Sequence, residues 1–333
     1  MKTAKTAGRK RVLSGMQPSG LLHLGNLLGA LDNWKELQAK YDCFFLVADW
    51  HALSTNYADP SRIREFSREL LIDWLAAGID PQRSTVFVQS RNPDHAILHL
   101  LLSMIVPVPW LERNPTYKEK QEEIKERDLS TYGFLGYPVL QAADILLYKP
   151  DYVPVGKDQL PHLELTRELA RRFNSLYGPV FPEPHEHLTK FPKVLGTDGR
   201  KMSKSYGNTI NLSDAEPVVR QKLKTMVTDP ARVKRTDPGN PDICPVYDFH
   251  KIFSPVAVIE RVNRECRTAE IGCIDCKKLT ADAMVERLNP IWEARRTLSK
   301  NPDQVEEIVH EGNKRASEVS HRTLEEVKAA MNI

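Results

Sequence analysis

Two segments of this 333-residue chain, about 175 residues apart, carry residue types that suit the binding of a nucleotide. The first runs from Gly15 to Asn26 and contains three glycines, one proline and short polar side chains. Gly20 and Gly25 lack the Cβ atoms that would hold a ligand away from the backbone, and the start of a following helix offers free N–H groups to phosphate. His23 lies close enough to Asn26 in the sequence for both side chains to point the same way. Taken alone, the segment is equally compatible with a plain glycine-rich turn.

The second segment, residues 201–205, combines two lysines with two serines and is flanked by Gly196, Gly199 and Gly207. The glycines predict a mobile loop. Two ammonium groups can neutralise the charge on a departing pyrophosphate, a task that needs no protein nucleophile. Eleven Lys or Arg outnumber four acids between 190 and 235, which a solvated basic face would also explain. Together with the first segment, the loop indicates a site for a triphosphate.

The elements around these segments have the pattern of a doubly wound α/β unit. Nearly continuous apolar runs flank helical stretches, as buried parallel strands with crossover helices require. The expected strands are residues 11–15, 43–49, 84–89 and 151–155, and the expected helices are 24–38, 60–77 and 159–173. The glycine-rich segment therefore lies between the first strand and the first helix.

The sequence predicts two domains. Residues 10–210 are expected to form a Rossmann-like doubly wound parallel sheet. It is interrupted at about 106–136 by a helical insertion with a highly charged stretch at 115–127. Strand signals fade beyond about residue 211. Helical patterns that include 284–298 and 302–331 predict an α-helical second domain over 211–333.

Two motifs, His23-Leu-Gly-Asn26 and Lys201-Met-Ser-Lys-Ser205, resemble the signatures of the class I aminoacyl-tRNA synthetases. The resemblance extends over nearly the whole chain, to the bacterial tryptophanyl-tRNA synthetases, through further runs at 14–20, 25–30, 137–148 and 153–159. It implies an enzyme that activates L-tryptophan with ATP and Mg²⁺ and transfers it to tRNA(Trp), whose anticodon the second domain would bind. A tyrosine-specific synthetase and a synthetase-like RNA-binding protein without catalysis are the alternatives.

The same resemblance implies roles for individual residues. Those implied to be catalytic are His23, Asn26, Lys201 and Lys204. Those implied to contact ATP are Gln17, Pro18, Ser19, Gly25, Asn26, Gly156, Lys157, Asp158, Val194, Lys201, Met202, Ser203, Lys204 and Ser205. Lys157 is a departure, because similar proteins commonly carry an acid there.

Tyr137, Gln141, Asp144 and Tyr148 recur at steps of four, three and four, which puts one polar stripe on an otherwise apolar helix. A carboxylate in such a helix is costly unless it accepts hydrogen bonds, and an indole N–H is one possible donor. A lysine at the helix edge is another possible partner. The resemblance implies that Asp144 recognises the indole of tryptophan. The other side chains implied to line that pocket are Gln141, Gln159, His51 and Tyr137.

Four of the five cysteines lie between positions 244 and 276, with the spacing C-x21-C-x6-C-x2-C at Cys244, Cys266, Cys273 and Cys276. Disulfides are not expected in a cytosolic protein. Four thiolates suit zinc or an iron–sulfur cluster, but a zinc ribbon usually has two C-x2-C pairs and only one is present. The pattern favours an iron–sulfur cluster over Zn²⁺ and over four free thiols. The resemblance to a cluster-bearing subgroup of the same synthetases strengthens this expectation and implies that the cluster is of the 4Fe-4S type.

The composition is 41% hydrophobic and 27% charged, with a formal net charge of +3. It is typical of a globular protein and excludes a histone-like polycation. The most apolar run, 97–106, is shorter than the ~20 residues of a membrane span, and the basic start lacks the apolar core of a signal peptide. We therefore expect a cytoplasmic protein without a membrane partner. The resemblance also implies a homodimer, for which 97–111 could supply the surface.

Overall fold

The structure of the protein is a computed structural model in which residues 8–115, 117, 128–156, 159–188 and 194–333 are described. At its centre lies a five-stranded sheet with the order β3-β2-β1-β4-β5, in which every paired strand is parallel. The strands are β1 (Arg11–Met16), β2 (Asp42–Val47), β3 (Ser84–Val88), β4 (Tyr152–Val155) and β5 (His185–Leu188). This is the doubly wound sheet that the sequence predicts. The order reverses beside β1, where such folds bind ligands at the carboxyl ends of the strands.

The strands alternate between two apolar cores because successive side chains point to opposite faces. In β2, Phe45 packs with Trp34 and Trp74 on one face, and Phe44 packs with Tyr148 on the other. The first face is covered by α2 (Asp32–Lys40) and α4 (Ile63–Ala76). The second is covered by α5 (Asp94–Ser103), α8 (Tyr132–Tyr148) and α9 (Leu160–Tyr177).

Shorter elements complete this part of the molecule. The helical run after β1 consists of α1 (Leu24–Asn26), a π-helical turn (Leu27–Leu31) and α2, so the helix expected at 24–38 is present with one widened turn. Two more helices are α3 (Asp49–Thr55) and α6 (Val108–Glu112). Most of the charged helix expected at 115–127 lies outside the described residues.

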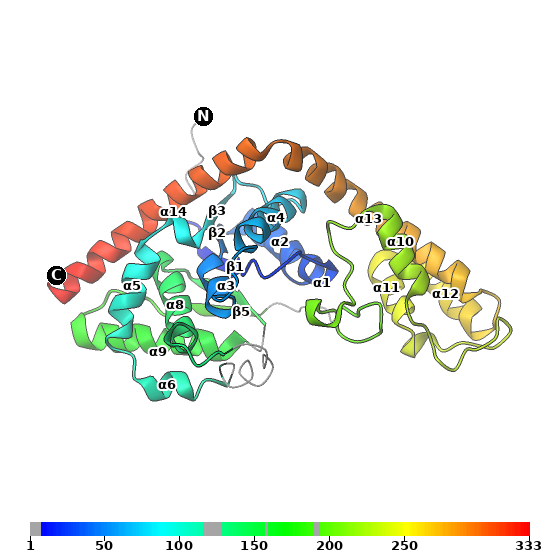
Figure 1. Cartoon of the computed structure of the whole chain (residues 1–333), viewed down its shortest axis with the longest axis horizontal. Coiled ribbons are helices and arrows are strands. Elements are labelled where there is room, and N and C mark those ends of the chain that lie inside the picture. Colours follow the sequence, from blue (N-terminus) through cyan, green and yellow to red (C-terminus); the bar gives the residue numbers. More distant parts are fainter. Residues whose placement is uncertain (1–7, 116, 118–127, 157–158, 189–193) are drawn as a thin grey trace.

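Beyond residue 211, the described chain is helical, as the sequence predicts. The helices are α10 (Glu216–Thr225), α11 (Pro245–Phe253), α12 (Val256–Arg267), α13 (Cys273–Lys300) and α14 (Pro302–Met331). Figure 1 shows α13 and α14 as a long bent rod along one side of the molecule, with α10, α11 and α12 at its far end.

The last helix returns to the sheet and packs against β3, α5 and α8. The side chain of Asn313 accepts a hydrogen bond from Val88 N at 3.1 Å and donates one to Val88 O at 2.9 Å, which imitates a paired strand at the sheet edge. Gly312 makes this approach possible, because a Cβ there would lie 1.7 Å from the carbonyl oxygen of Val86. The carboxyl-terminal helix therefore contributes to the same body as the sheet.

Candidate active site

The two nucleotide-binding segments predicted from the sequence lie side by side. The chain that follows residues 201–205, the lysine loop, pairs with the glycine-rich segment at 15–26. Leu24 N donates to Ile210 O at 3.0 Å, and Leu212 N donates to Leu22 O at 2.9 Å. The lysine loop itself also reaches the turn, where Lys204 Nζ donates to Gly20 O at 3.1 Å. Gly20 has a φ of +137°, a conformation that favours glycine. The structure thus joins segments that are remote in sequence through backbone hydrogen bonds.

His23 caps the helix that begins at Leu24. Its Nδ1 accepts a hydrogen bond from Gly25 N at 3.1 Å, while Asn26 Oδ1 accepts one from His23 N at 3.0 Å. Burial, with a smaller contribution from the charge of Lys204, lowers the pKa of His23 to about 4. The imidazole is therefore neutral near pH 7. Because Nδ1 is an acceptor, the proton must lie on Nε2, which can donate to a ligand oxygen.

The lysine loop is organised by a residue that the sequence analysis did not single out. Asn208 is 2% exposed, and its Oδ1 accepts a hydrogen bond from Ser203 N at 2.8 Å. Its Nδ2 donates to Asp198 Oδ1 at 2.7 Å and to Lys201 O at 3.2 Å. Gly196 is required beside it, because a Cβ at that position would lie 2.3 Å from the amide group of Asn208. The loop is therefore held by one fully bonded amide.

The other residues implied to contact ATP surround these two segments where they are described. Pro18 is buried and Ser19 is exposed, and Ser19 N donates to Gln17 O at 2.9 Å. Val194, which is 4% exposed, accepts a backbone hydrogen bond from Met202 at 2.9 Å. Gly156 follows β4, and its carbonyl oxygen accepts a hydrogen bond from Gln159 N at 3.0 Å. Lys157 and Asp158 lie outside the described residues.

A cavity of about 170 Å³ opens at the carboxyl ends of β1 and β2. Four of the five side chains expected to hold the amino acid line it: His51, Gln141, Asp144 and Gln159. Gln17 from the glycine-rich segment lines it as well, so the cavity adjoins the nucleotide segments. Tyr137 lies beside it, with its ring centroid 6.4 Å from that of His51 and its hydroxyl 3.2 Å from His162 Nε2.

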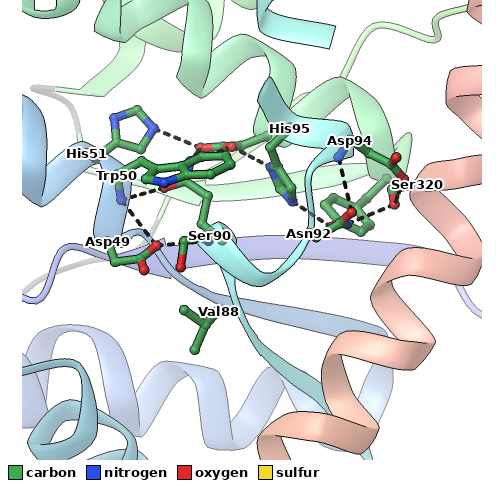
Figure 2. Close-up of polar contacts among 12 residues, drawn as sticks. Asp49, Trp50, His51, Val88, Ser90, Asn92, Asp94, His95 and Ser320 are labelled. Atoms are coloured by element: carbon green, nitrogen blue, oxygen red, sulfur yellow. Dashed lines mark hydrogen bonds and ion pairs between the residues drawn. The ribbon is translucent and has the colours of Figure 1, made fainter. Parts of the chain in front are cut away.

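Asp144 is 4% exposed and sits at the centre of a buried hydrogen-bond network. Figure 2 shows His51 and His95, two members of this network. It accepts hydrogen bonds from His51 Nε2 at 2.8 Å, from His95 Nδ1 at 2.6 Å and from Gln89 Nε2 at 2.7 and 2.9 Å. Burial by itself would raise the pKa of Asp144, but the hydrogen bonds from His51 and His95 outweigh it and lower the pKa to about 2. The group is therefore an ionised acceptor, and its described partners are histidine and glutamine rather than lysine. The sequence analysis missed Gln89 and His95.

The four clustered cysteines share one region at the start of α13. Cys244 and Cys276 are buried, and Cys266 and Cys273 are half-buried. The pKa of Cys276 is raised to about 12, mainly by burial and further by the other three thiols. Gly239 packs tightly here, since a Cβ at that position would lie 2.6 Å from Cys266 Sγ. Four thiols that influence one another fit a thiolate-bound group chemically, yet the described side chains contain no group of three or more potential ligands arranged around a metal position.

Comparison with known proteins agrees with the fold. The family model of class I tRNA synthetases (W and Y) matches residues 5–289. A tryptophan–tRNA ligase of Thermotoga maritima is 55% identical over 325 residues, covering 97% of this chain and 99% of the relative. That of Aquifex aeolicus is 43% identical, with 97% and 100% covered. The crystal structure of tryptophanyl-tRNA synthetase from Campylobacter jejuni complexed with ADP and tryptophan superposes with a TM-score of 0.90 at 31% identity, covering 97% of this chain and all of that one.

The chain therefore belongs to the class I aminoacyl-tRNA synthetases, in the family that acts on tryptophan or tyrosine. Its relatives of high identity and nearly full coverage decide between the two amino acids. Its activity is that of a tryptophan–tRNA ligase, which activates L-tryptophan with ATP and transfers it to tRNA(Trp). Among the described helices, none combines the length and the apolar character that crossing a membrane requires.

Proposed function

We propose that the glycine-rich segment and the lysine loop bind ATP between them, with His23, Asn26, Lys201 and Lys204 as the catalytic residues. The observation that carries this proposal is the backbone pairing of residues 22–24 with 210–212, together with the contact of Lys204 with Gly20. The pairing fixes the position, relative to the turn, of the chain that leaves the loop. Mg²⁺ would accompany the nucleotide as a counter-ion of its phosphates.

In the first step, a carboxylate oxygen of tryptophan attacks the α-phosphorus of ATP, and the bond from this phosphorus to the bridging oxygen breaks. Pyrophosphate leaves with the electron pair. The two lysines neutralise the charge that develops on it, and neutral His23 donates through Nε2–H to a phosphate oxygen. In the second step, a hydroxyl of the tRNA terminus attacks the acyl carbon and AMP leaves. We assign no general base.

The remaining nucleotide contacts are proposed from their position around the same segments. Gln17, Pro18, Ser19 and Gly25 belong to the turn, and Met202, Ser203 and Ser205 belong to the loop. Val194 is hydrogen-bonded to Met202 of the loop, and Gly156, Lys157 and Asp158 complete the set that the family resemblance implies. Backbone N–H groups are the expected donors in a segment so rich in glycine.

For the amino acid, we propose that Asp144 accepts a hydrogen bond from the indole N–H inside the cavity, with Gln141, Gln159, His51 and Tyr137 around the ring. A carboxylate offers about four acceptor positions, and His51, His95 and Gln89 already direct donors at them. His51 lines the cavity and contacts Asp144 Oδ2. The indole must therefore share that oxygen with His51 or displace it. Where the indole displaces His51, a side chain without an N–H would leave this buried acceptor short of one partner, which disfavours its binding.

We further propose that Cys244, Cys266, Cys273 and Cys276 hold a 4Fe-4S cluster, with Zn²⁺ as the alternative. The mutual influence of the four thiols and the tight packing of Gly239 against Cys266 support a common site. Such a cluster would hold the loop before α13 in place, because amino-acid activation requires no electrons. Iron and acid-labile sulfide close to four each per chain, with brown colour, are expected after anaerobic purification. Stoichiometric zinc in a colourless protein would refute the cluster.

We propose that residues 10–210, with the insertion at about 106–136, carry out catalysis and that 211–333 bind the tRNA anticodon, with the exception of α14, which packs on the sheet of the first part. We also propose a cytoplasmic homodimer. Its surface would be the apolar face of α5 and α6, where Leu100, Met104 and Val108 are 55%, 66% and 52% exposed. Contiguous exposed apolar side chains of this kind are typical of interfaces. Sedimentation of the wild type and of Met104→Glu tests it, because the variant should sediment as a monomer and a dimeric variant would contradict this surface.

Pyrophosphate exchange into ATP, measured with each of the twenty amino acids, tests the reaction itself. Exchange should depend on tryptophan, and tyrosine should support it at least 10⁴-fold less well, as expected for a site built around a hydrogen bond to its substrate. Tyrosine-dependent exchange, or exchange with no amino acid dependence, would refute the proposal.

A further inference from the structure

The hydrogen-bond network around Asp144 extends well beyond the cavity, to the carboxyl-terminal helix (Figure 2). His95 Nε2 lies 2.8 Å from the hydroxyl of Tyr148. Asn92 Nδ2 lies 3.2 Å from that hydroxyl and 2.9 Å from Ser320 Oγ, and Ser320 Oγ lies 2.6 Å from Asp94 Oδ2. Each of these residues is at most 7% exposed. The chain of contacts thus connects the substrate cavity to α14.

The direction of each hydrogen bond follows from Asn92. Its amide oxygen accepts from Asp94 N at 3.3 Å, so its nitrogen faces the two hydroxyl groups and can only donate to them. The hydroxyl of Tyr148 therefore accepts from Asn92, and its own proton is left for His95 Nε2. Since Nε2 accepts, the proton of a neutral His95 must lie on Nδ1, where it is donated to Asp144. The burial of Tyr148 raises the pKa of its hydroxyl well above the usual value, so this donor keeps its proton.

From this geometry we propose that Tyr148 and His95 are positioning residues for tryptophan. The O–H of Tyr148 fixes His95 as the Nδ1–H tautomer, and that N–H orients Asp144 toward the cavity. Asn92 ties the arrangement to Ser320 on α14, so the carboxyl-terminal helix contributes to amino-acid selectivity. The inference rests on the proposed role of Asp144 in binding the indole.

Tyr148→Phe tests the tautomer directly. Without the O–H, the proton of His95 can move to Nε2, and a bare Nδ1 would then face the carboxylate. Only a protonated imidazole would restore the donor, and protonation is favoured as the pH falls. The KM for tryptophan of this variant should therefore rise about tenfold at pH 8, the loss expected for a buried hydrogen bond, and return toward the wild-type value at pH 6. The KM for ATP should stay unchanged at both pH values.

Several other titratable groups lie around His95. Asp144 and Tyr148 face it from α8, His51 is bonded to the same carboxylate from α3, and Asp94 and His99 belong to its own helix. Ser320 of α14 is neutral. Because His51, His99 and Asp94 are common to the wild type and the variant, the ratio of the two KM values at each pH isolates the effect of the tyrosine hydroxyl.

Tyr247→Phe is the matched control, because it removes a buried hydroxyl that is bonded to Asn263 Nδ2 at 2.8 Å in the helical region away from the cavity. It should show no pH-dependent change in the KM for tryptophan. An equal rise for Tyr148→Phe at pH 6 and pH 8 would show a packing role and overturn the proposal, as would a wild-type KM at pH 8.

Two further measurements distinguish the positioning role of Tyr148 and His95 from the proposed binding of the indole by Asp144. Asp144→Asn should raise the KM for tryptophan. If the KM of Asp144→Asn is unchanged, the proposed role of Asp144 is refuted. If that KM rises but the KM of Tyr148→Phe does not depend on pH, only the positioning proposal is refuted. Long-range ¹H–¹⁵N correlation on the wild type, with His95 assigned through its loss in His95→Asn, should show a protonated Nδ1 and a bare Nε2. A protonated Nε2 would overturn the proposal even if Tyr148→Phe did not fold.

Discussion

Lys204 of the lysine loop donates a hydrogen bond to the carbonyl oxygen of Gly20 at 3.1 Å, across 184 residues of sequence. A backbone carbonyl is a weaker partner for an ammonium group than a phosphate, because charge-assisted hydrogen bonds between two ions are the stronger ones. The side chain therefore has reason to leave Gly20 for the phosphates when ATP binds, while the loop stays anchored through the pairing of 210–212.

Replacement of Lys204 by alanine should lower kcat for tryptophan activation by about 10²–10³, the usual cost of removing one preorganised charge-stabilising donor. The KM for tryptophan should hardly change, since Lys204 does not line the cavity. Single-turnover adenylate formation measures the effect. Lys224→Ala, which removes a lysine from α10, serves as the control and should retain full activity. Equal rates for Lys204→Ala and the wild type would contradict a catalytic role.

His23→Asn separates the two functions of the histidine. The amide oxygen of asparagine can replace Nδ1 as the acceptor for Gly25 N, which preserves the helix cap, but the Nε2–H donor is lost. We expect kcat to fall by about 10²-fold, in the range of a lost transition-state donor, with little loss of stability. A variant with wild-type kcat would show that Nε2–H has no part in the reaction.

The same histidine makes stability depend on pH. Its folded pKa, about 4, lies below the unfolded value of 6.5, so the unfolded chain binds more protons in the interval between them. Its contribution is complete above pH 6.5 and is lost as the pH falls through 4. Denaturant titrations between pH 7 and 4 should therefore show a shallower loss of unfolding free energy in His23→Asn than in the wild type. Parallel curves would argue against a neutral, buried His23.

Asn208→Ala should loosen the lysine loop without touching the cavity. The substitution leaves Ser203 N and Asp198 without the amide that now bonds both. We expect kcat/KM for ATP to fall by about tenfold, equivalent to one hydrogen bond of about 1.4 kcal/mol, and the KM for tryptophan to stay constant. Limited proteolysis should cut the variant within 196–207 faster than the wild type. Unchanged ATP kinetics would mean that the loop is positioned by other contacts.

A buried ion pair fastens α13 to α4. Arg295 bonds to Asp73, which is fully buried, and to Glu69 at 2.6 Å. Arg295→Met should reduce the free energy of unfolding by about 3–5 kcal/mol above pH 7, because burial already raises the pKa of Asp73 to about 7 and the variant leaves this carboxyl group without its partner. Arg287→Met on the same helix removes an exposed pair with Asp32 and should cost no more than about 1 kcal/mol. Equal losses in urea titrations would contradict the buried character of the Arg295 pair.

The fold was largely predictable because its parallel strands are buried on both faces and must be apolar. Residues 43–49 and 84–89 show this pattern and form β2 and β3, and the amphipathic stretch 302–331 forms α14 with those bounds. β5 has the polar sequence His-Glu-His-Leu, typical of a short edge strand, and no apolar run marks it. The packing of α14 against β3 depends on Gly312 and Asn313. Neither residue belongs to an apolar or amphipathic pattern that would predict this contact.

The candidate site was predictable where one segment holds its residues together. The stripe on α8 and the motifs at 23–26 and 201–205 are local patterns, and the structure brings their members together. Gln89 and His95 reach Asp144 from the 3-10 turn after β3 and from α5, 55 and 49 residues away in sequence. Asn208 organises the lysine loop through hydrogen bonds with Asp198, Lys201 and Ser203. Partners of this kind become visible only when the chain is folded, because no periodicity in the sequence connects them.

Crystals of the protein soaked with tryptophan and a non-hydrolysable ATP analogue test the central claim most directly. We expect the phosphates between the turn at 17–26 and the loop at 201–205, with Lys204 Nζ moved from Gly20 O to a phosphate oxygen, and the indole N–H at Asp144. A nucleotide bound elsewhere while Lys204 remains on Gly20 would contradict the account.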